Sequence, residues 1–226
     1  MRILLSAIFM LFVAALSAQS IFFPTQRGTV LLYQQTDEHG SVTGYSRHTI
    51  TSVTGSDNNM TISYLLENMD ENRQVTLEVP GKTHIRDGNM IFDIEPMIAP
   101  HLQSSGLGLE AEFSGTFMEI PVSFSPGQRF ADTEGTIRIG RGMMGVRVRM
   151  RVTDARCIAI EEVTVPAGAF NTYQITQTIS NTMLLRTTSV RLVSWLAPGI
   201  GTVKSRTYDD RGRLQSVSRL VELTKP

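Results

Sequence analysis

The amino-acid sequence predicts an all-β fold: a curved antiparallel sheet that forms a barrel or an open half-barrel, with one short helix. First, strand-like runs recur along the chain between turn signals rich in Gly, Pro, Asn and Asp. Second, apolar and arginine side chains alternate strictly over 146–152, as expected for a strand with one buried face. Third, several runs have about ten residues and would be about 30 Å long. Strands of that length in one sheet twist until the sheet curls or closes.

Hairpins and one helix account for the first half of the chain. The Asp-Glu-His-Gly segment at 37–40 is a turn signal in which Gly40 supplies a positive φ, and Pro80 and Gly81 are expected to end a second hairpin. The helix is expected over 95–105, because Pro96 suits a first helical turn and apolar residues follow at helical spacing. The expected strands are 29–36, 42–53, 60–67, 73–79, 83–86 and 90–94.

Two marked Pro/Gly turns organise the second half. In each, proline and glycine are expected to fix a sharp turn between strands, with an aromatic side chain packed against the core beside it. The residues expected to have these structural roles are Pro166, Gly168, Phe170, Trp195, Pro198, Gly199 and Gly201. The expected strands are 109–113, 117–122, 136–139, 146–152, 156–165, 172–180, 183–195, 202–208 and 214–223.

The first and last predicted hairpins share a sequence pattern. Each carries Asp, two residues, Gly, a polar and an aliphatic residue, and then Ser-Arg at the same offset, starting at Asp37 and at Asp209. One interpretation is that the same favourable hairpin turn is used twice. The other is that the two terminal hairpins are neighbours that close the sheet.

The first 20 residues predict a secretory signal peptide. Arg2 precedes an apolar run over 3–16, and Ala18-Gln19-Ser20 fits a cleavage site before Ile21. The run is too short for a membrane span, and no Cys follows it for lipid attachment. We therefore expect a signal peptide over 1–20 and a single all-β barrel-like domain over 21–226. The mature protein is expected to be soluble, and periplasmic or extracellular.

Several function classes lack support in the sequence. The formal net charge of +0 gives no overall attraction to nucleic acid or to an anionic membrane. The only cysteine, Cys157, lies in a strand-like run where core packing is expected. Gly140, Gly142 and Gly145 match the dinucleotide fingerprint in letters alone, because a strand follows where the fingerprint needs a helix.

Catalytic and metal-binding patterns are also missing. The four histidines, His39, His48, His84 and His101, share no metal-ligand spacing. Ser46 lacks the second glycine of a nucleophile elbow. We therefore expect no metal, no cofactor and no enzymatic activity.

The only local charge concentration is a group of arginines on the alternating strand. Arg147, Arg149 and Arg151 could bind an anion or an acidic partner through their guanidinium groups. The alternative is a solvated strand face balanced by carboxylates such as that of Glu134. No aromatic residues are interleaved with the arginines, which argues against nucleic acid.

Three segments carry a family resemblance: F-F-P-T-Q-R-G-T-V-L-L-Y-Q-Q-T-D, V-T-V-P-A-G-A-F-N-T-Y-Q-I and W-L-A-P-G-I-G-T-V-K-S. With these motifs, the chain resembles the TapB-like family of exported Bacteroidetes proteins over about 22–223. The resemblance implies a β-rich, barrel-like domain, export across the inner membrane and no established activity. The family's name links it to a tetratricopeptide-repeat partner. The resemblance supplies no catalytic residues.

Two functional hypotheses follow. The first is a non-catalytic cell-envelope protein whose curved sheet binds an apolar or amphipathic ligand, or a segment of a partner protein. The 11 methionines suit such a site, since methionine adapts to irregular apolar surfaces, although core filling is the preferred explanation for them. The second is a structural or assembly protein that docks to a tetratricopeptide-repeat or other envelope partner, with Arg147, Arg149 and Arg151 as its candidate surface.

Overall fold

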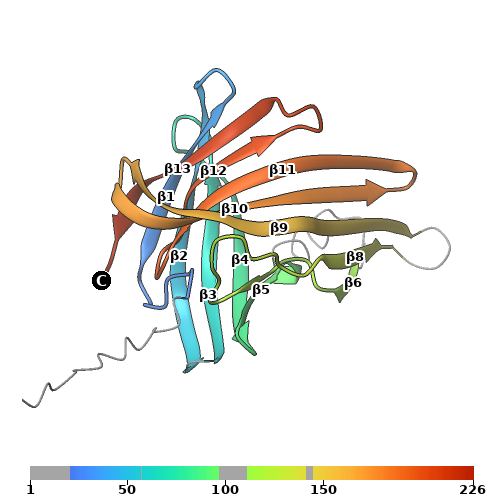
Figure 1. The fold of residues 1–226 in the computed structure, drawn as a ribbon, viewed down its shortest axis with the longest axis horizontal. Coiled ribbons are helices and arrows are strands. Elements are labelled where there is room, and N and C mark those ends of the chain that lie inside the picture. Colours follow the sequence, from blue (N-terminus) through green and yellow to red (C-terminus); the bar gives the residue numbers. More distant parts are fainter. Residues whose placement is uncertain (1–20, 57, 97–110, 141–144) are drawn as a thin grey trace, which may run out of the picture.

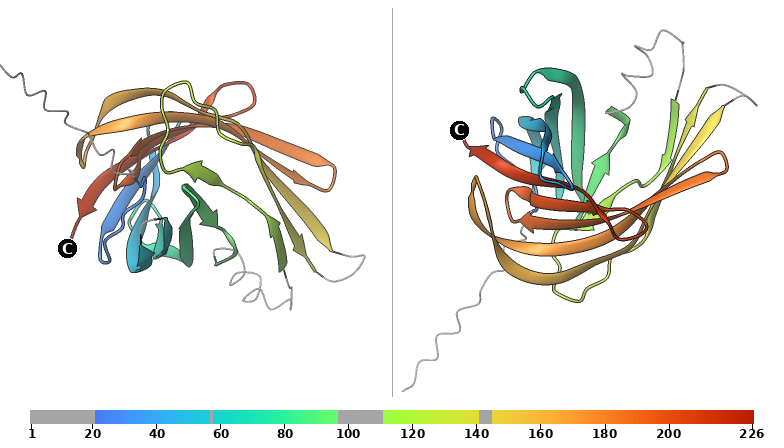
Figure 2. Two further views of the ribbon diagram at one scale, coloured as in Figure 1. Left: turned by 60° about the horizontal axis from the view of Figure 1, so that its bottom comes forward. Right: turned by 90° about the horizontal axis from the view of Figure 1, so that it is seen from above.

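The fold is a single curved antiparallel sheet. The computed structural model describes residues 21–56, 58–96, 111–140 and 145–226, and over these residues thirteen strands pair in the order β6-β8-β9-β10-β11-β12-β13-β1-β2-β3-β4-β5-β7. The ribbon forms an open trough (Figures 1 and 2), which confirms the predicted all-β half-barrel. The expected signal peptide lies outside the described residues, as does the expected helix beyond Glu95 and Pro96, which are helical.

The strands have the following bounds: β1 Val30–Asp37, β2 Val42–Ser56, β3 Asn59–Met69, β4 Val75–Arg86, β5 Asn89–Asp93, β6 Ala111–Gly115, β7 Glu119–Pro121, β8 Thr133–Ile139, β9 Val146–Val165, β10 Gly168–Met183, β11 Arg186–Ala197, β12 Gly201–Tyr208 and β13 Leu214–Thr224.

The first and last strands are neighbours at the centre of the sheet. β1 pairs antiparallel with β13, from Val30 opposite Thr224 to Asp37 opposite Ser216. The two hairpins that share a sequence pattern therefore lie side by side (Figure 1). They form a central seam that joins two halves of the sheet, and they do not close a barrel.

The shared pattern encodes one loop conformation. Asp37 Oδ1 accepts hydrogen bonds from the backbone N–H groups two and four residues later, and Asp209 does the same. Gly40 and Gly212 follow with φ of 85° and 77°. A third copy begins at Asp70, where Arg73 takes the positive φ, 62°, in place of glycine. The sequence pattern missed this copy because it relied on the glycine.

The two edges of the sheet are connected by a very short segment. β6 pairs with β8 at one edge and β7 pairs with β5 at the other. Only residues 116–118 separate β6 from β7, so the edges lie within about 14 Å of each other there. Thr116 N–H donates to the Glu134 carbonyl on one side, and the Met118 carbonyl accepts from Phe92 N–H on the other. This segment bridges the mouth of the trough.

Some predicted boundaries are wrong. The runs 146–152 and 156–165 form one strand, β9, with Asp154 at a positive φ of 54° where the pairing register shifts. Residues 127–130 hydrogen bond to β9 just beyond that point, where β8 no longer reaches. The turn between β10 and β11 is at Leu184-Leu185, three residues later than the predicted strand ends imply.

Pro80 and Gly81 do not end a hairpin, because β4 runs straight through them. Gly81 is opposite Tyr64 on β3, and the Tyr64 ring lies across the space that a Cβ at position 81 would fill. That Cβ would lie 2.3 Å from ring atoms Cε2 and Cζ. The glycine is therefore a packing site for an aromatic ring and not a turn residue.

We expect Gly81→Ala to lower the free energy of unfolding by about 1–3 kcal/mol, since the Tyr64 ring must move out of its position. Urea unfolding measures this change. In a Tyr64→Leu background the same substitution should cost clearly less, because the clashing ring is absent. Equal costs in both backgrounds would show that the ring is not the cause.

Candidate ligand pocket

The concave face of the sheet carries a row of polar residues across its centre. Ser194 on β11 is opposite Ser205 on β12, Ser205 is opposite Ser218 on β13, and Ser218 is opposite Gln35 on β1. Directly opposed residues in antiparallel strands project to the same face. Gln35 Nε2 donates to Ser46 Oγ on β2, at 2.9 Å, which extends the row to a fifth strand.

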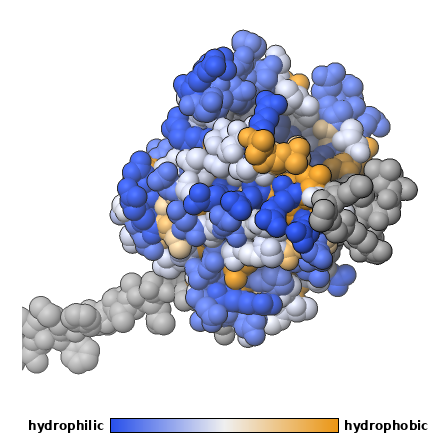
Figure 3. Space-filling model, turned by 90° about the vertical axis from the view of Figure 1, so that its right-hand side faces the viewer, coloured by the Kyte–Doolittle hydropathy of each residue, from blue (hydrophilic) through white to orange (hydrophobic). Residues whose placement is uncertain are grey.

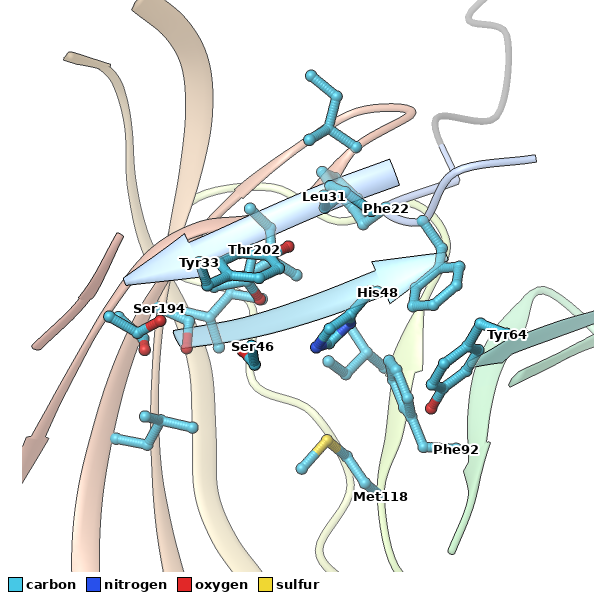
Figure 4. Close-up of a pocket in the computed structure, with 18 of the residues that line it drawn as sticks. Phe22, Leu31, Tyr33, Ser46, His48, Tyr64, Phe92, Met118, Ser194 and Thr202 are labelled. Atoms are coloured by element: carbon cyan, nitrogen blue, oxygen red, sulfur yellow. The ribbon is translucent and has the colours of Figure 1, made fainter. Parts of the chain in front are cut away.

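Aromatic residues lie at the other end of the same face. The Phe23 ring contacts those of Tyr64 and Phe92, with centroids 5.4 Å and 6.2 Å away. His48 lies between Tyr33 and Tyr64, with ring centroids 5.1 Å and 6.0 Å from it. Met118, from the segment that bridges the sheet edges, faces this group (Figure 4).

A cavity of about 450 Å³ separates the polar row from the aromatic group. Its walls include Ser194 and Thr202 at one end and Phe22, Phe92 and Met118 at the other (Figure 4). Its volume lies in the usual range for small-molecule sites, which are mostly apolar with a few placed polar groups. The cavity could therefore hold one small amphipathic molecule.

The N-terminal lead-in forms one wall of this cavity. Residues 21–24 cross to the β11–β12 turn, where Gly199 N–H donates to the Ile21 carbonyl at 2.7 Å. Gly201 has a φ of +95°, and a Cβ there would lie 3.2 Å from the Phe22 carbonyl oxygen. The turn of Pro198, Gly199 and Gly201 thus positions Phe22 and Phe23 at the pocket, a role that the sequence pattern did not indicate.

Burial sets the protonation of the titratable pocket residues. It lowers the pKa of His48 to about 4, so the imidazole is neutral near pH 7. It also raises the pKa of the Tyr33 and Tyr64 phenols. No Lys or Arg is among the described residues that line the pocket. The described lining can therefore offer hydroxyl, amide and imidazole groups and the Asp93 carboxylate for hydrogen bonds, but no cation.

The remaining turn residues do not line the pocket. Trp195 lies between the pocket residues Ser194 and Leu196, so its side chain points away from the pocket. It packs in a second cluster with Val163 and Leu220. Pro166 and Ala167 form the β9–β10 turn before Gly168, and Ala167 N–H donates to the Leu220 carbonyl at 3.3 Å. Phe170 packs against the same cluster.

The predicted arginine group lies on the outer half of β9, where the arginines alternate with Val148 and the pocket residue Met150. Arg149 and Arg151 both form ion pairs with Glu134 on β8, at 3.2 Å and 3.3 Å. All three side chains are about half exposed. Arg147 is opposite Arg138 on β8. The arginine face is thus partly charge-balanced, and it is the face of β9 opposite the one on which Met150 lines the pocket.

A histidine and a hydroxyl also lie near Asp93, whose carboxylate lines the pocket. His84 Nδ1 is 3.0 Å from Thr61 Oγ1, and His84 Nε2 is 3.9 Å from Asp93 Oδ2. The second distance is too long for a hydrogen bond. Thr61 and His84 are directly opposed in regular strands, so the hydroxyl has no elbow that would expose it to a substrate. This contact is a cross-strand pair and not a catalytic arrangement.

The described residues form neither a metal site nor a reactive thiol site. No group of three or more His, Cys, Asp or Glu side chains among them is positioned to hold a metal ion. Cys157 is buried, and burial raises the pKa of its thiol. Nor does any helix among these residues have the length and apolar character needed to cross a membrane.

The architecture defines a class of protein: an open antiparallel half-barrel with a pocket on its concave face. A family model described as DUF3108-like matches residues 26–220, and the chain belongs to this family. A search of curated protein sequences found no significant match.

Two crystal structures share the fold. One is a candidate exported protein with a YmcC-like fold from Bacteroides fragilis, with 20% identity and a TM-score of 0.69 over 91% of this chain and 100% of that one. The other is a candidate lipoprotein from Parabacteroides distasonis, with 19% identity and a TM-score of 0.70 over 91% of this chain and 99% of that one. At these identities the similarity shows the fold alone.

Proposed function

We propose that this protein is an exported, non-catalytic cell-envelope protein that binds a neutral amphipathic molecule in the concave-face pocket. The observation that supports it most is the composition of the cavity, which has an aromatic end, a polar row and no cationic side chain among its described lining residues. Export is supported by the signal-peptide pattern of residues 1–20 and by the descriptions of the two structural relatives as exported or lipoprotein. Membership of the TapB-like family in particular stays a prediction.

Because no cationic side chain is among the described lining residues, the pocket favours a ligand whose head group is not an anion. A carboxylate or phosphate buried in this pocket would lose its hydration without gaining an ion pair, which is unfavourable. A hydroxyl, ester or amide group would instead exchange hydrogen bonds with Ser194, Ser205 and Ser218. The aromatic end, with Phe22, Phe92 and Ile120, suits an aliphatic chain.

The test compares two probes that share one chain, 1-monolauroylglycerol and laurate. Isothermal titration calorimetry at pH 7, below the critical micelle concentration of each, should show tighter binding of the neutral glyceride by about tenfold, the effect of a single unpaired polar group. Native mass spectrometry of gently purified protein should show a retained small molecule. Failure of both probes to bind, together with a clean apo mass, would contradict the proposal.

A blocking variant assigns the binding to the cavity. Ser194→Trp places a large side chain in the pocket and should abolish glyceride binding. Thr188→Trp is the matched control, because Thr188 is exposed on the same strand, nearer its outer end. Undiminished binding by Ser194→Trp would place the ligand elsewhere.

A further inference from the structure

The β10–β11 hairpin ends in an exposed apolar tip. Its two-residue turn is Leu184-Leu185, and the exposed fractions of Met183, Leu184 and Leu185 are 53%, 75% and 103%. The hairpin projects from the body of the molecule together with the outer end of β9 (Figure 1). The face at this end shows apolar surface among hydrophilic residues (Figure 3).

The conformation of the turn gives no reason for leucine at positions 184 and 185. Leu184 has a φ of 54°, a left-handed conformation that is unfavourable for a bulky side chain. The two-residue turn between β4 and β5, by contrast, uses Asp87 and Gly88 at φ of 50° and 75°, the residue types that positive φ favours. At Leu184-Leu185, therefore, a leucine has an unfavourable backbone conformation and both apolar side chains are exposed to solvent.

The two turn leucines lie beyond the apolar interior. Below the turn, polar cross-strand pairs fill one face of the hairpin: Thr182 bonds to Thr187 at 2.9 Å and Ser180 to Ser189 at 2.8 Å. Met183 projects to the opposite face, where it is opposite Val148 and in line with Met150, which packs against the core. Among the described residues none buries Leu184 or Leu185.

Arginines surround the tip. Arg186 follows the turn directly and is exposed. On the adjacent strand Val148 is opposite Met183, which places Arg147 level with the turn and Arg149 opposite Thr182. Glu134, which pairs with Arg149, is opposite Arg151 and so lies further from the tip. Although the chain has a formal net charge of +0, the described residues around this tip are cationic.

We propose that the β10–β11 tip docks on an anionic lipid bilayer, with Leu184 and Leu185 inserted at the boundary between head groups and acyl chains. Arg147, Arg149 and Arg186 would then lie at the phosphate level. A protruding tip with three apolar side chains is too small for a stable protein interface, which buries about 800 Å² on each partner. The same tip suits a bilayer, where apolar insertion and cationic attraction add to give reversible attachment. This inference does not depend on the pocket's ligand.

Vesicle co-sedimentation tests the proposal. The purified protein should bind vesicles of equal parts phosphatidylglycerol and phosphatidylcholine, and bind pure phosphatidylcholine vesicles much less. Leu184→Gly/Leu185→Asn should lower the partition coefficient by about tenfold or more, because two apolar side chains are lost from the bilayer. The Gly-Asn pair is typical of two-residue hairpin turns, so the hairpin is retained. An unchanged urea midpoint verifies the fold.

A control variant and an arginine variant separate the apolar and the electrostatic contributions to vesicle binding. Ile160→Asn is the matched control, since Ile160 on β9 is 52% exposed and lies away from the tip; vesicle binding should not change. Arg147→Gln/Arg186→Gln should weaken binding to anionic vesicles only, and added salt should weaken it in the same way. No binding of the native protein to anionic vesicles would overturn the proposal, as would equal binding by the leucine variant. Self-association that the leucine variant abolishes, without vesicle binding, would identify a second copy of the chain as the occupant instead.

Discussion

Trp195→Ala should lower the free energy of unfolding by about 3–5 kcal/mol, the usual cost of removing a large buried aromatic side chain. Trp195 is 6% exposed and packs with Val163 and Leu220. Its Nε1 donates to Glu161 Oε1 at 2.6 Å, and Lys204 Nζ lies 4.9 Å from the ring centroid. The ring thus joins β9, β11 and β12 on the face opposite the pocket. Equilibrium unfolding in urea measures the change.

Trp195→Phe is the companion variant. It keeps most of the apolar ring but loses the N–H that bonds to Glu161, so it should cost about 1–2 kcal/mol. A loss below about 1 kcal/mol for the alanine variant would contradict the inference that Trp195 anchors the second cluster.

The free energy of unfolding should fall by about 3 kcal/mol as the pH is lowered from about 6.5 to about 4, because of His48. Burial lowers the folded-state pKa of this imidazole to about 4, whereas the unfolded-state value is about 6.5. Between these values the unfolded state binds a proton that the folded state does not, so acid favours unfolding. Above pH 6.5 both states are neutral at this position, and below pH 4 the loss attributable to His48 stops.

Denaturant unfolding at a series of pH values measures this effect. Burial also lowers the pKa of His84, which contributes in the same direction, so the comparison belongs in a His84→Gln background. There, His48→Phe retains an aromatic side chain beside Tyr33 and Tyr64 and should remove most of the slope between pH 6.5 and 4. An unchanged slope would mean that His48 is protonated without cost in the folded state.

The fold class could be predicted from local patterns because it depends on strand alternation and turn signals. The alternation over 146–152 and the turn at Gly40 are found as expected. Errors arose where a residue had a tertiary role that its local signal does not reveal. Gly81 is a glycine because the Tyr64 ring occupies its Cβ space, and Leu184-Leu185 form a turn against their intrinsic preference.

The pocket could not be predicted, because it depends on strand register. Ser194, Ser205 and Ser218 are unremarkable serines in three separate strands, and only the pairing of β11, β12 and β13 places them in one row. His48 was noted in the sequence, but the rings of Tyr33 and Tyr64 reach it from neighbouring strands. The arginine pattern on β9, by contrast, was visible in the sequence because its residues share a single strand.

The central seam has a consequence for the order in which the molecule folds. β1 and β13 are paired although Val30 and Thr224 lie almost two hundred residues apart, so the ends of the described chain must meet before the two halves of the sheet join. During synthesis, β1 has no partner on its β13 side until the final strand has emerged. The sheet can therefore be completed only after β13 has been synthesised. The strand on which the central pairing depends is thus the one that is made last.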